Sequence, residues 1–193
     1  KERGSIIDIE SHEVQFIFDE KGYVKDILPV ERGVSEQMIE EFMVLANETV
    51  ASYFDVKELP FLYRVHEYPD PDLILQLHNY LELLGIKVKM PATIQPKFLQ
   101  EILERTKDHP LSKNIQMMLV RTMKRALYSE TNIGHFGLAS TSYTHFTSPI
   151  RRYPDLIVHR LLKEFMRHKG SLSNKEIKKY SYLLPKVALH SSE

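Results

Sequence analysis

The segment from 135 to 160 concentrates side chains that can bind phosphate, and it reads HFGLASTSYTHFTSPIRRYPDLIVHR. Hydroxyl groups donate hydrogen bonds, and the flat fork of an arginine matches two oxygens of a phosphate. Aromatic rings in the same segment can stack on the bases of a single-stranded nucleic acid. The candidate binding residues are Tyr143, His145, Thr147, Ser148, Arg151, Arg152 and Tyr153.

Ser148 followed by Pro149 is typical of a helix N-cap and its first helical residue. A helix N-terminus carries unpaired N–H groups and a partial positive charge, so the pattern predicts an anion site there. For the Ser-Pro pair alone, an ordinary helix start with surface arginines is the commoner alternative. A proline inside a helix bends it, so Pro154 predicts a short turn near Arg151 and a longer helix from about Asp155.

The composition indicates a globular chain: 42% of its 193 residues are hydrophobic. There are no cysteines, which excludes disulfides and thiolate metal sites and fits a cytoplasmic protein. No apolar run has the length of a membrane span, and no signal peptide opens the chain. Lysine and arginine together equal aspartate and glutamate at 26 each, so any basic surface must be local.

Hydrophobic patterning predicts an α+β fold, mostly helical with a small antiparallel sheet, in a single domain over 1–193. The expected elements are a β-hairpin over 12–19 and 22–29, a strand over 61–66, and helices over 35–53, 70–84, 96–106 and 112–128, with a last helix after Ser173. Asp70 and Ser112 are the expected caps of two helices. Ser173 and Glu176 have the spacing of a capping box.

Glu40 and Glu41 are adjacent in the helix over 35–53, and Asn47 shares a face with Glu40 two turns later. The same helix carries a broad apolar stripe on its other side, made of Ile39, Phe42, Met43, Ala46 and Val50. The carboxylate of Glu40 is therefore expected to face a groove or solvent. Spacing alone favours a substrate contact and a solvated helix face equally.

Two further sets of basic residues are candidate functional residues. In a helix over 112–128, one face would carry Arg121, Lys124, Arg125 and Tyr128. That face is either a stripe for a phosphate backbone or, more commonly, a solvated charged surface. Arg64 and His66 share one face of the expected strand, where an ion pair of Arg64 with Glu58 or Glu67 is the plain alternative.

Three segments, 31–47, 115–128 and 135–160, together resemble the exoribonucleases of the ribonuclease II / ribonuclease R family. The resemblance is to the C-terminal half of their catalytic domain, called RNB, and it covers essentially the whole chain. Residues 132–139 and 151–155 are more similar to ribonuclease R than to ribonuclease II.

The resemblance implies a hydrolase that degrades single-stranded RNA processively from the 3′ end and releases nucleoside monophosphates. It implies that Arg151 stabilises the charge that develops at the scissile phosphate. Tyr143, Ser148 and Arg152 would position the strand. Glu40 would accept a hydrogen bond from the ribose 2′-OH, the group that distinguishes RNA from DNA.

Members of this family hold magnesium with an Asp-x-Asp-Asp cluster, and this chain contains no such cluster. The resemblance therefore implies a fragment that supplies the phosphate-binding half of an active site and lacks the metal-binding half. We expect no metal ligand and no bound cofactor in this chain, magnesium in the full-length enzyme, and no activity of the chain alone. A non-enzymatic RNA-binding module of the same fold is the alternative.

Overall fold

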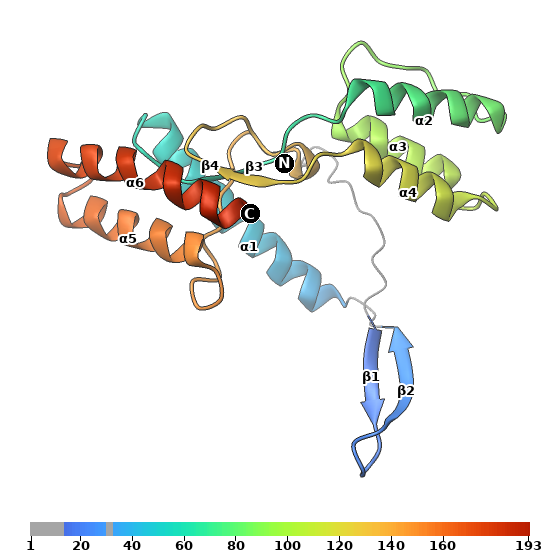
Figure 1. Ribbon diagram of the computed structural model, residues 1–193, viewed down its shortest axis with the longest axis horizontal. Helices are drawn as coiled ribbons and strands as arrows, with labels where there is room; N and C mark the ends of the chain where they lie inside the picture. Colours follow the sequence, from blue (N-terminus) through green and yellow to red (C-terminus); the bar gives the residue numbers. More distant parts are fainter. Residues whose placement is uncertain (1–13, 30–32) are drawn as a thin grey trace.

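The computed structural model describes residues 14–29 and 33–193. Its elements in chain order (Figure 1) are β1 (Val14–Phe18), β2 (Val24–Pro29), α1 (Val34–Val56), β3 (Tyr63–Val65), α2 (Pro71–Leu83), α3 (Pro96–Thr106), α4 (Ser112–Thr122), β4 (Leu127–Ser129), the short 3-10 helix η1 (Phe136–Leu138), α5 (Tyr153–Arg167) and α6 (Asn174–Ser192). Helices predominate, and the described strands form two antiparallel pairs, β1–β2 and β3–β4. The predicted α+β class is confirmed.

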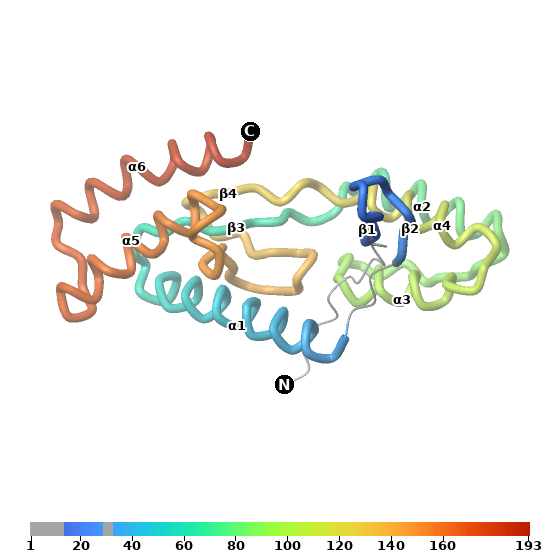
Figure 2. Tube along the Cα trace, turned by 90° about the horizontal axis from the view of Figure 1, so that it is seen from below, coloured from blue at the N-terminus to red at the C-terminus, as the bar shows by residue number. Residues whose placement is uncertain are grey.

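Two hydrophobic cores divide the described chain. In the first, Phe54 of α1 packs against Phe61 and against Phe165 of α5, with ring centres 4.6 and 5.3 Å apart. The second lies among α2, α3 and α4 and also takes in Phe136. Figures 1 and 2 show α2, α3 and α4 grouped at one end, α5 and α6 at the other, and the β3–β4 pair between them. The hairpin β1–β2 stands away from both cores, and its side chains are largely exposed.

Strand β3 holds together segments that are distant in sequence. On one side it pairs with β4, with Arg64 opposite Tyr128. On the other side, the N–H of Arg64 donates to the carbonyl of Tyr143 at 2.9 Å, and the N–H of His66 donates to the carbonyl of Gly134 at 3.0 Å. The segment from 134 to 144 is therefore fixed along β3, which positions the residues that follow it.

Most of the predicted helix boundaries are confirmed. The side chain of Asp70 accepts hydrogen bonds from the first turn of α2, and Gly85 follows that helix with a φ of +76°. Such a left-handed conformation is one that glycine adopts without strain, which explains why the helix stops there. The capping box of Ser173 and Glu176 is present at the start of α6. The helix predicted over 96–106 is α3, which buries Phe98, Leu99, Ile102 and Leu103 on one face.

The helix predicted over 112–128 is wrong in its last third. α4 ends at Thr122, and the backbone of 127–129 pairs with β3 instead. Tertiary pairing has overridden a local sequence that is compatible with a helix. The predicted stripe is therefore wrong, because only Arg121 of its four residues lies in α4. Ser112 is the first helical residue, whereas Leu111 occupies the N-cap position without a side-chain bond.

Helix α1 is buried in its second half only. Asn47, Ala51 and Phe54 are its buried residues, whereas Ile39 and Phe42 of the predicted stripe are 53% and 58% exposed. The N-terminal part of the apolar stripe is thus not covered by the described residues, whereas Val50, at its other end, packs against the first core. Among the described helices, none combines the length and hydrophobicity of a membrane span.

Candidate active site around residues 143 to 155

The loop before α5 differs from the predicted helix start. α5 begins at Tyr153 with Arg152 as its N-cap residue, and Pro154 occupies the first turn, where a missing N–H costs no hydrogen bond. The N–H groups of Arg151 and Arg152 donate to the carbonyl of Ser148 at 3.3 and 3.1 Å. The predicted short turn is confirmed, but the predicted role of Ser148 as a helix N-cap is wrong.

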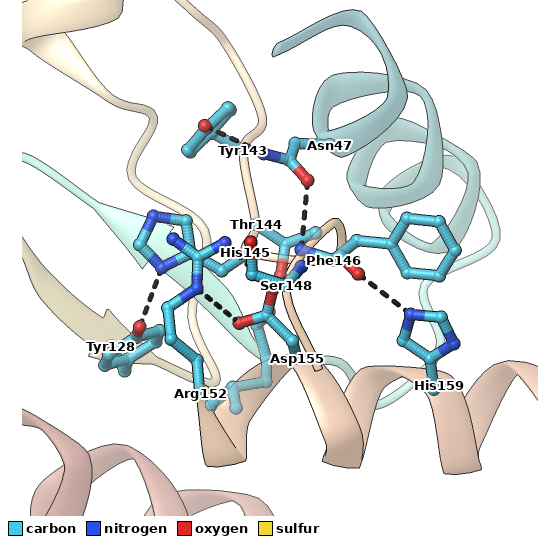
Figure 3. Close-up of polar contacts among 11 residues, drawn as sticks. Asn47, Tyr128, Tyr143, Thr144, His145, Phe146, Ser148, Arg152, Asp155 and His159 are labelled. Carbon is cyan, nitrogen blue, oxygen red and sulfur yellow. Dashed lines mark hydrogen bonds and ion pairs between the residues drawn. The ribbon is translucent and has the colours of Figure 1, made fainter. Parts of the chain in front are cut away.

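Asp155 organises this loop from inside (Figure 3). Its side chain is fully buried and accepts two hydrogen bonds from the guanidinium of Arg152, both at 2.9 Å, and one from the N–H of Ser148 at 2.8 Å. A buried carboxylate requires such partners, because desolvation of an unpaired charge is costly. The N–H of Ser148 is therefore not available to an external anion, and Arg152 is committed to Asp155.

Asn47 anchors the same segment to α1. Its side-chain oxygen accepts from the N–H of Phe146 at 3.0 Å, and its amide nitrogen donates to the hydroxyl of Tyr143 at 2.9 Å (Figure 3). Between these two positions, the hydroxyl of Thr144 donates to the carbonyl of Leu62 at 2.6 Å. Asn47 is 3% exposed, so its side chain supports the loop and is not accessible to a bound nucleic-acid strand.

Three aromatic side chains between 143 and 153 could stack on bases, and one of them is open. Tyr143 is 7% exposed, and Phe146 stacks on His159 with ring centres 4.2 Å apart. His159 also donates to the carbonyl of Phe146 at 2.8 Å, which keeps both rings in place. Tyr153 is 52% exposed and stands at the first position of α5.

A row of aromatic rings runs beneath the loop. Five rings follow one another with edge-to-face contacts, and neighbouring ring centres lie between 5.1 and 5.9 Å apart. In order they are His66, His135, Tyr143, His145 and Tyr128. At one end, the guanidinium of Arg64 lies 4.7 Å from the ring centre of Tyr128. The hydroxyl of Tyr128 also makes a 2.7 Å hydrogen bond with Nδ1 of His145. Arg64 therefore packs on a ring, and the ion pair considered for it does not form, since Glu67 pairs with Lys124.

The histidines in this row are neutral at physiological pH. Burial, reinforced by nearby positive charges, lowers the pKa of His135 to about 3 and that of His145 to about 4. Burial also lowers the pKa of His66. Nδ1 of His66 accepts from the N–H of Gly137, so Nε2 carries the proton and donates to the carbonyl of Lys124. Positive charge at the site therefore comes from arginines.

The outer surface of the site is formed by exposed and partly exposed side chains of the loop. Arg151 is exposed, and its side chain makes no hydrogen bond or ion pair with any residue in 14–29 or 33–193. Thr147 and Ser148 are partly exposed beside it in the chain. A cavity of about 670 Å³ adjoins the start of α5, lined by Tyr128, Arg152, Tyr153, Pro154, His190 and Ser191. Sequence reasoning missed the last two, because they come from the end of α6.

Glu40 lies on the exposed N-terminal half of α1. Two helical turns, about 11 Å, separate it from Asn47 along the helix axis. The structure thus places Glu40 on a helix that is anchored to the loop at Asn47, but it does not bring Glu40 into the row of rings or into the cavity beside α5. Glu41 is equally exposed.

The residues around Arg151 do not fit a magnesium site. Asp155, in the first turn of α5, is the acidic residue that contacts the loop, and its oxygens accept hydrogen bonds from Arg152 and Ser148. Within the described residues, the one group of side chains spaced to hold a metal is Glu164, His168 and Glu176, at the opposite end of α5. The expectation that this chain has no metal ligand stays a prediction.

The buried histidines predict a loss of stability in mild acid. Their pKa values are lowered in the folded state, so the unfolded chain takes up protons first as the pH falls through about 6.5. Their stabilising contribution is complete above that pH and is lost below it. Between pH 7.5 and 5.5 we expect about 1 kcal/mol of unfolding free energy to be lost per histidine. Urea denaturation at the two pH values measures this loss.

His135→Gln and His145→Gln should each make the pH dependence of the unfolding free energy shallower. Equal unfolding free energies at pH 7.5 and 5.5 in the unaltered protein would contradict the buried, neutral state of these rings.

Comparison with known proteins places this geometry in a family. A family model described as RNB domain matches residues 1–168. The chain is 59% identical over 192 residues to ribonuclease R of Thermotoga maritima, a match that covers all of the chain and 27% of that protein. The chain thus spans about a quarter of the length of the curated relatives it matches.

Solved structures agree. Mycoplasma genitalium RNase R in complex with ribose-methylated single-stranded RNA superposes with a TM-score of 0.85 at 33% identity, over 98% of this chain and 30% of that one. Yeast Ssd1, described as a pseudonuclease, superposes with a TM-score of 0.66 at 25% identity, over 84% of this chain and 20% of that one. The match to the family model and the identity to ribonuclease R together show that the chain belongs to the RNB domain family.

Proposed function

We propose that this chain supplies the phosphate-binding side of the active site of a hydrolytic exoribonuclease, which removes nucleoside monophosphates from the 3′ end of single-stranded RNA. The observation that carries the proposal is the difference between two adjacent arginines. Arg152 is fixed by buried Asp155, whereas Arg151 is exposed and has no side-chain partner among the described residues. A free guanidinium on a braced loop is suited to meet the charge of a phosphate.

Bracing of the loop is central to the proposed chemistry. Hydrolysis of a phosphodiester places additional negative charge on the phosphoryl oxygens in the transition state, and a donor that is already in place stabilises it without reorganisation. Asn47, Thr144 and Asp155 hold the loop at three points. In the proposal, Arg151 stabilises the developing charge, the hydroxyls of Thr147 and Ser148 donate to phosphate oxygens, and Tyr153 stacks on a base.

Two buried rings serve the site indirectly in this proposal. The hydrogen bond of Tyr143 with Asn47 holds the loop to α1. The hydrogen bond of His145 with Tyr128 holds the loop to β4. Magnesium, which the resemblance implies, would polarise the phosphate and activate water. Since the residues near Arg151 do not fit that ion, the proposal assigns this chain no metal ligand there.

A second candidate is an RNA-binding module without activity. The observation that favours it is the shared fold with yeast Ssd1, which is described as a pseudonuclease. In that case the loop would bind a phosphate backbone, and Arg151 would contribute to affinity alone.

The two candidates differ in what happens to a labelled RNA. The protein encoded by the full reading frame, given magnesium and a 5′-labelled single strand, is expected to shorten it stepwise from the 3′ end and to release nucleoside monophosphates. The 193-residue chain alone is expected to leave the strand intact. Binding without shortening by the full-length protein would support the second candidate. Stepwise release by the chain alone, free of contaminating nuclease, would contradict the proposed absence of the metal-binding half.

Arg151→Ala should lower turnover far more than affinity. Loss of one donor to transition-state charge typically costs about 3 kcal/mol, or roughly a hundredfold in kcat. KM should change little, because other phosphate contacts hold the strand. Steady-state kinetics on single-stranded RNA separate the two constants. Arg167→Ala, an exposed arginine at the far end of α5, is the matched control. A raised KM with unchanged kcat would show that Arg151 only binds substrate.

Glu40→Ala tests the assignment that rests on the resemblance. Without a carboxylate to accept from the 2′-OH, discrimination against DNA should relax, while RNA is still cleaved. The measurement is the ratio of kcat/KM for matched RNA and DNA strands. Glu41→Ala is the adjacent control and should leave the ratio as it is. An unchanged ratio in Glu40→Ala reduces that residue to a surface charge, and a change in Glu41→Ala alone transfers the role to its neighbour.

A further inference from the structure

The zero net charge of this chain conceals two oppositely charged parts. Residues 151–193 contain ten lysines and arginines against four aspartates and glutamates, a net charge of +6. The preceding 150 residues contain 16 against 22, a net charge of −6. The excess of positive charge therefore lies in the part of the chain that forms the helix pair α5 and α6 and the turn before it (Figure 1).

Within this pair, one face of α6 gathers the lysines. Exposed residues recur there at intervals of three or four, which places them on one side of a helix: Lys175, Lys178, Lys179, Tyr182 and Lys186. The opposite side is buried through Tyr180, Leu184, Val187 and Ala188. We call this exposed set the α6 face. From Lys175 to Lys186 it extends about 17 Å at 1.5 Å per residue.

Little negative charge opposes the α6 face. The carboxylate of Glu176 turns toward the end of α5, where it accepts a hydrogen bond from the N–H of Ser173 and lies 3.3 Å from Nδ1 of His168. Glu193 follows at the far end of the helix. The ammonium of Lys186 lies 3.8 Å from the ring centre of Tyr182, so a cation and an aromatic ring are presented together. Tyr182 is 70% exposed, and the ammonium of Lys186 also donates a hydrogen bond to its hydroxyl.

The α6 face leads to the candidate active site. His190 lies one further turn along the same side of α6 from Lys186. It also lines the 670 Å³ cavity, together with Arg152 and Tyr153. Cationic and aromatic side chains therefore continue from the cavity along the length of α6, which is the combination that single-strand binding surfaces use.

We propose that the α6 face is a second RNA-binding surface, which carries the sugar–phosphate backbone of the substrate strand outside the active-site cavity. The inference rests on the proposed function, because it requires a strand that enters that cavity. Its lysines would neutralise successive phosphates and Tyr182 would stack on a base, so binding would be independent of sequence. Charge complementarity and continuity with the cavity select a polyanionic single strand as the occupant.

The test replaces charge without altering buried contacts. The triple variant K175Q/K178Q/K186Q is made in the protein encoded by the full reading frame, and RNA binding is measured with magnesium withheld. For a strand of about 30 nucleotides, Kd should rise roughly tenfold or more, and the slope of log K against log salt should fall by about 2, since each lost phosphate contact removes about 0.7. A strand of about four nucleotides, which fills little more than the cavity, should lose much less affinity than the long one.

Matched variants separate charge from other effects. K175R/K178R/K186R keeps the charges and should bind the long strand as the unaltered protein does. K87Q/K89Q/K107Q removes three exposed lysines from the lobe of α2 to α4 and should not reproduce the change in slope. Tyr182→Leu should weaken long-strand binding at an unchanged slope, because stacking releases no counterions.

One result would overturn the α6 face alone, and another would overturn the proposed function as well. Unchanged affinity and slope in K175Q/K178Q/K186Q overturn the α6 face as an RNA surface, including the case in which a protein partner or another part of the same protein covers it, and leave the proposed function standing. Failure of the unaltered protein to bind or shorten any RNA overturns the proposed function together with this inference.

Discussion

The buried carboxylate of Asp155 is the constraint on which the candidate site depends. One charge inside the protein draws in the guanidinium of Arg152 and the N–H of Ser148, and so ties the loop to the first turn of α5. Removal of either partner of such a pair leaves an uncompensated buried charge, which costs about 3–5 kcal/mol. Because Asp155 takes the second arginine, the first is left to the outside. The same ion pair therefore both shapes the loop and determines which guanidinium can meet a substrate.

Neutral polar groups complete this support and keep charge out of the interior. Asn47 satisfies one N–H and one hydroxyl without carrying a charge, and the histidines of the ring row are held neutral by burial. A protonated imidazole near Arg64 and Arg152 would repel both, which is why these cations lower the pKa of His145 further. The interior of the site thus contains hydrogen bonds between uncharged groups and one ion pair, that of Arg152 with Asp155. The unpaired positive charge of Arg151 lies at the surface.

Whether a feature of this structure could be predicted from sequence depends on how far apart in the chain the interacting residues lie. The starts of α2 and α6 depend on residues within one turn, so Asp70 and Ser173 identify them. The end of α4 depends on pairing with β3, roughly sixty residues earlier, and no local signal marks it. Ser148 followed by Pro149 has the local pattern of a cap, but Asp155 takes its N–H. Tyr143 reads as an open ring, yet Asn47, 96 residues away, fixes it inside.

The uneven distribution of charge along the chain favours the approach of a negatively charged ligand to the site from one side. A phosphate backbone is attracted by the part of the chain from 151 onward, at +6, and repelled by the part before it, at −6. Such asymmetry biases the encounter of a charged ligand over distances up to about one Debye length, near 8–10 Å at moderate salt. Arg151 stands at the junction of the two parts, where the loop joins α5. In the proposed function, a strand drawn toward α5 and α6 would reach the loop from the basic side. Its phosphates would then meet Arg151, whose side chain has no partner among the described residues.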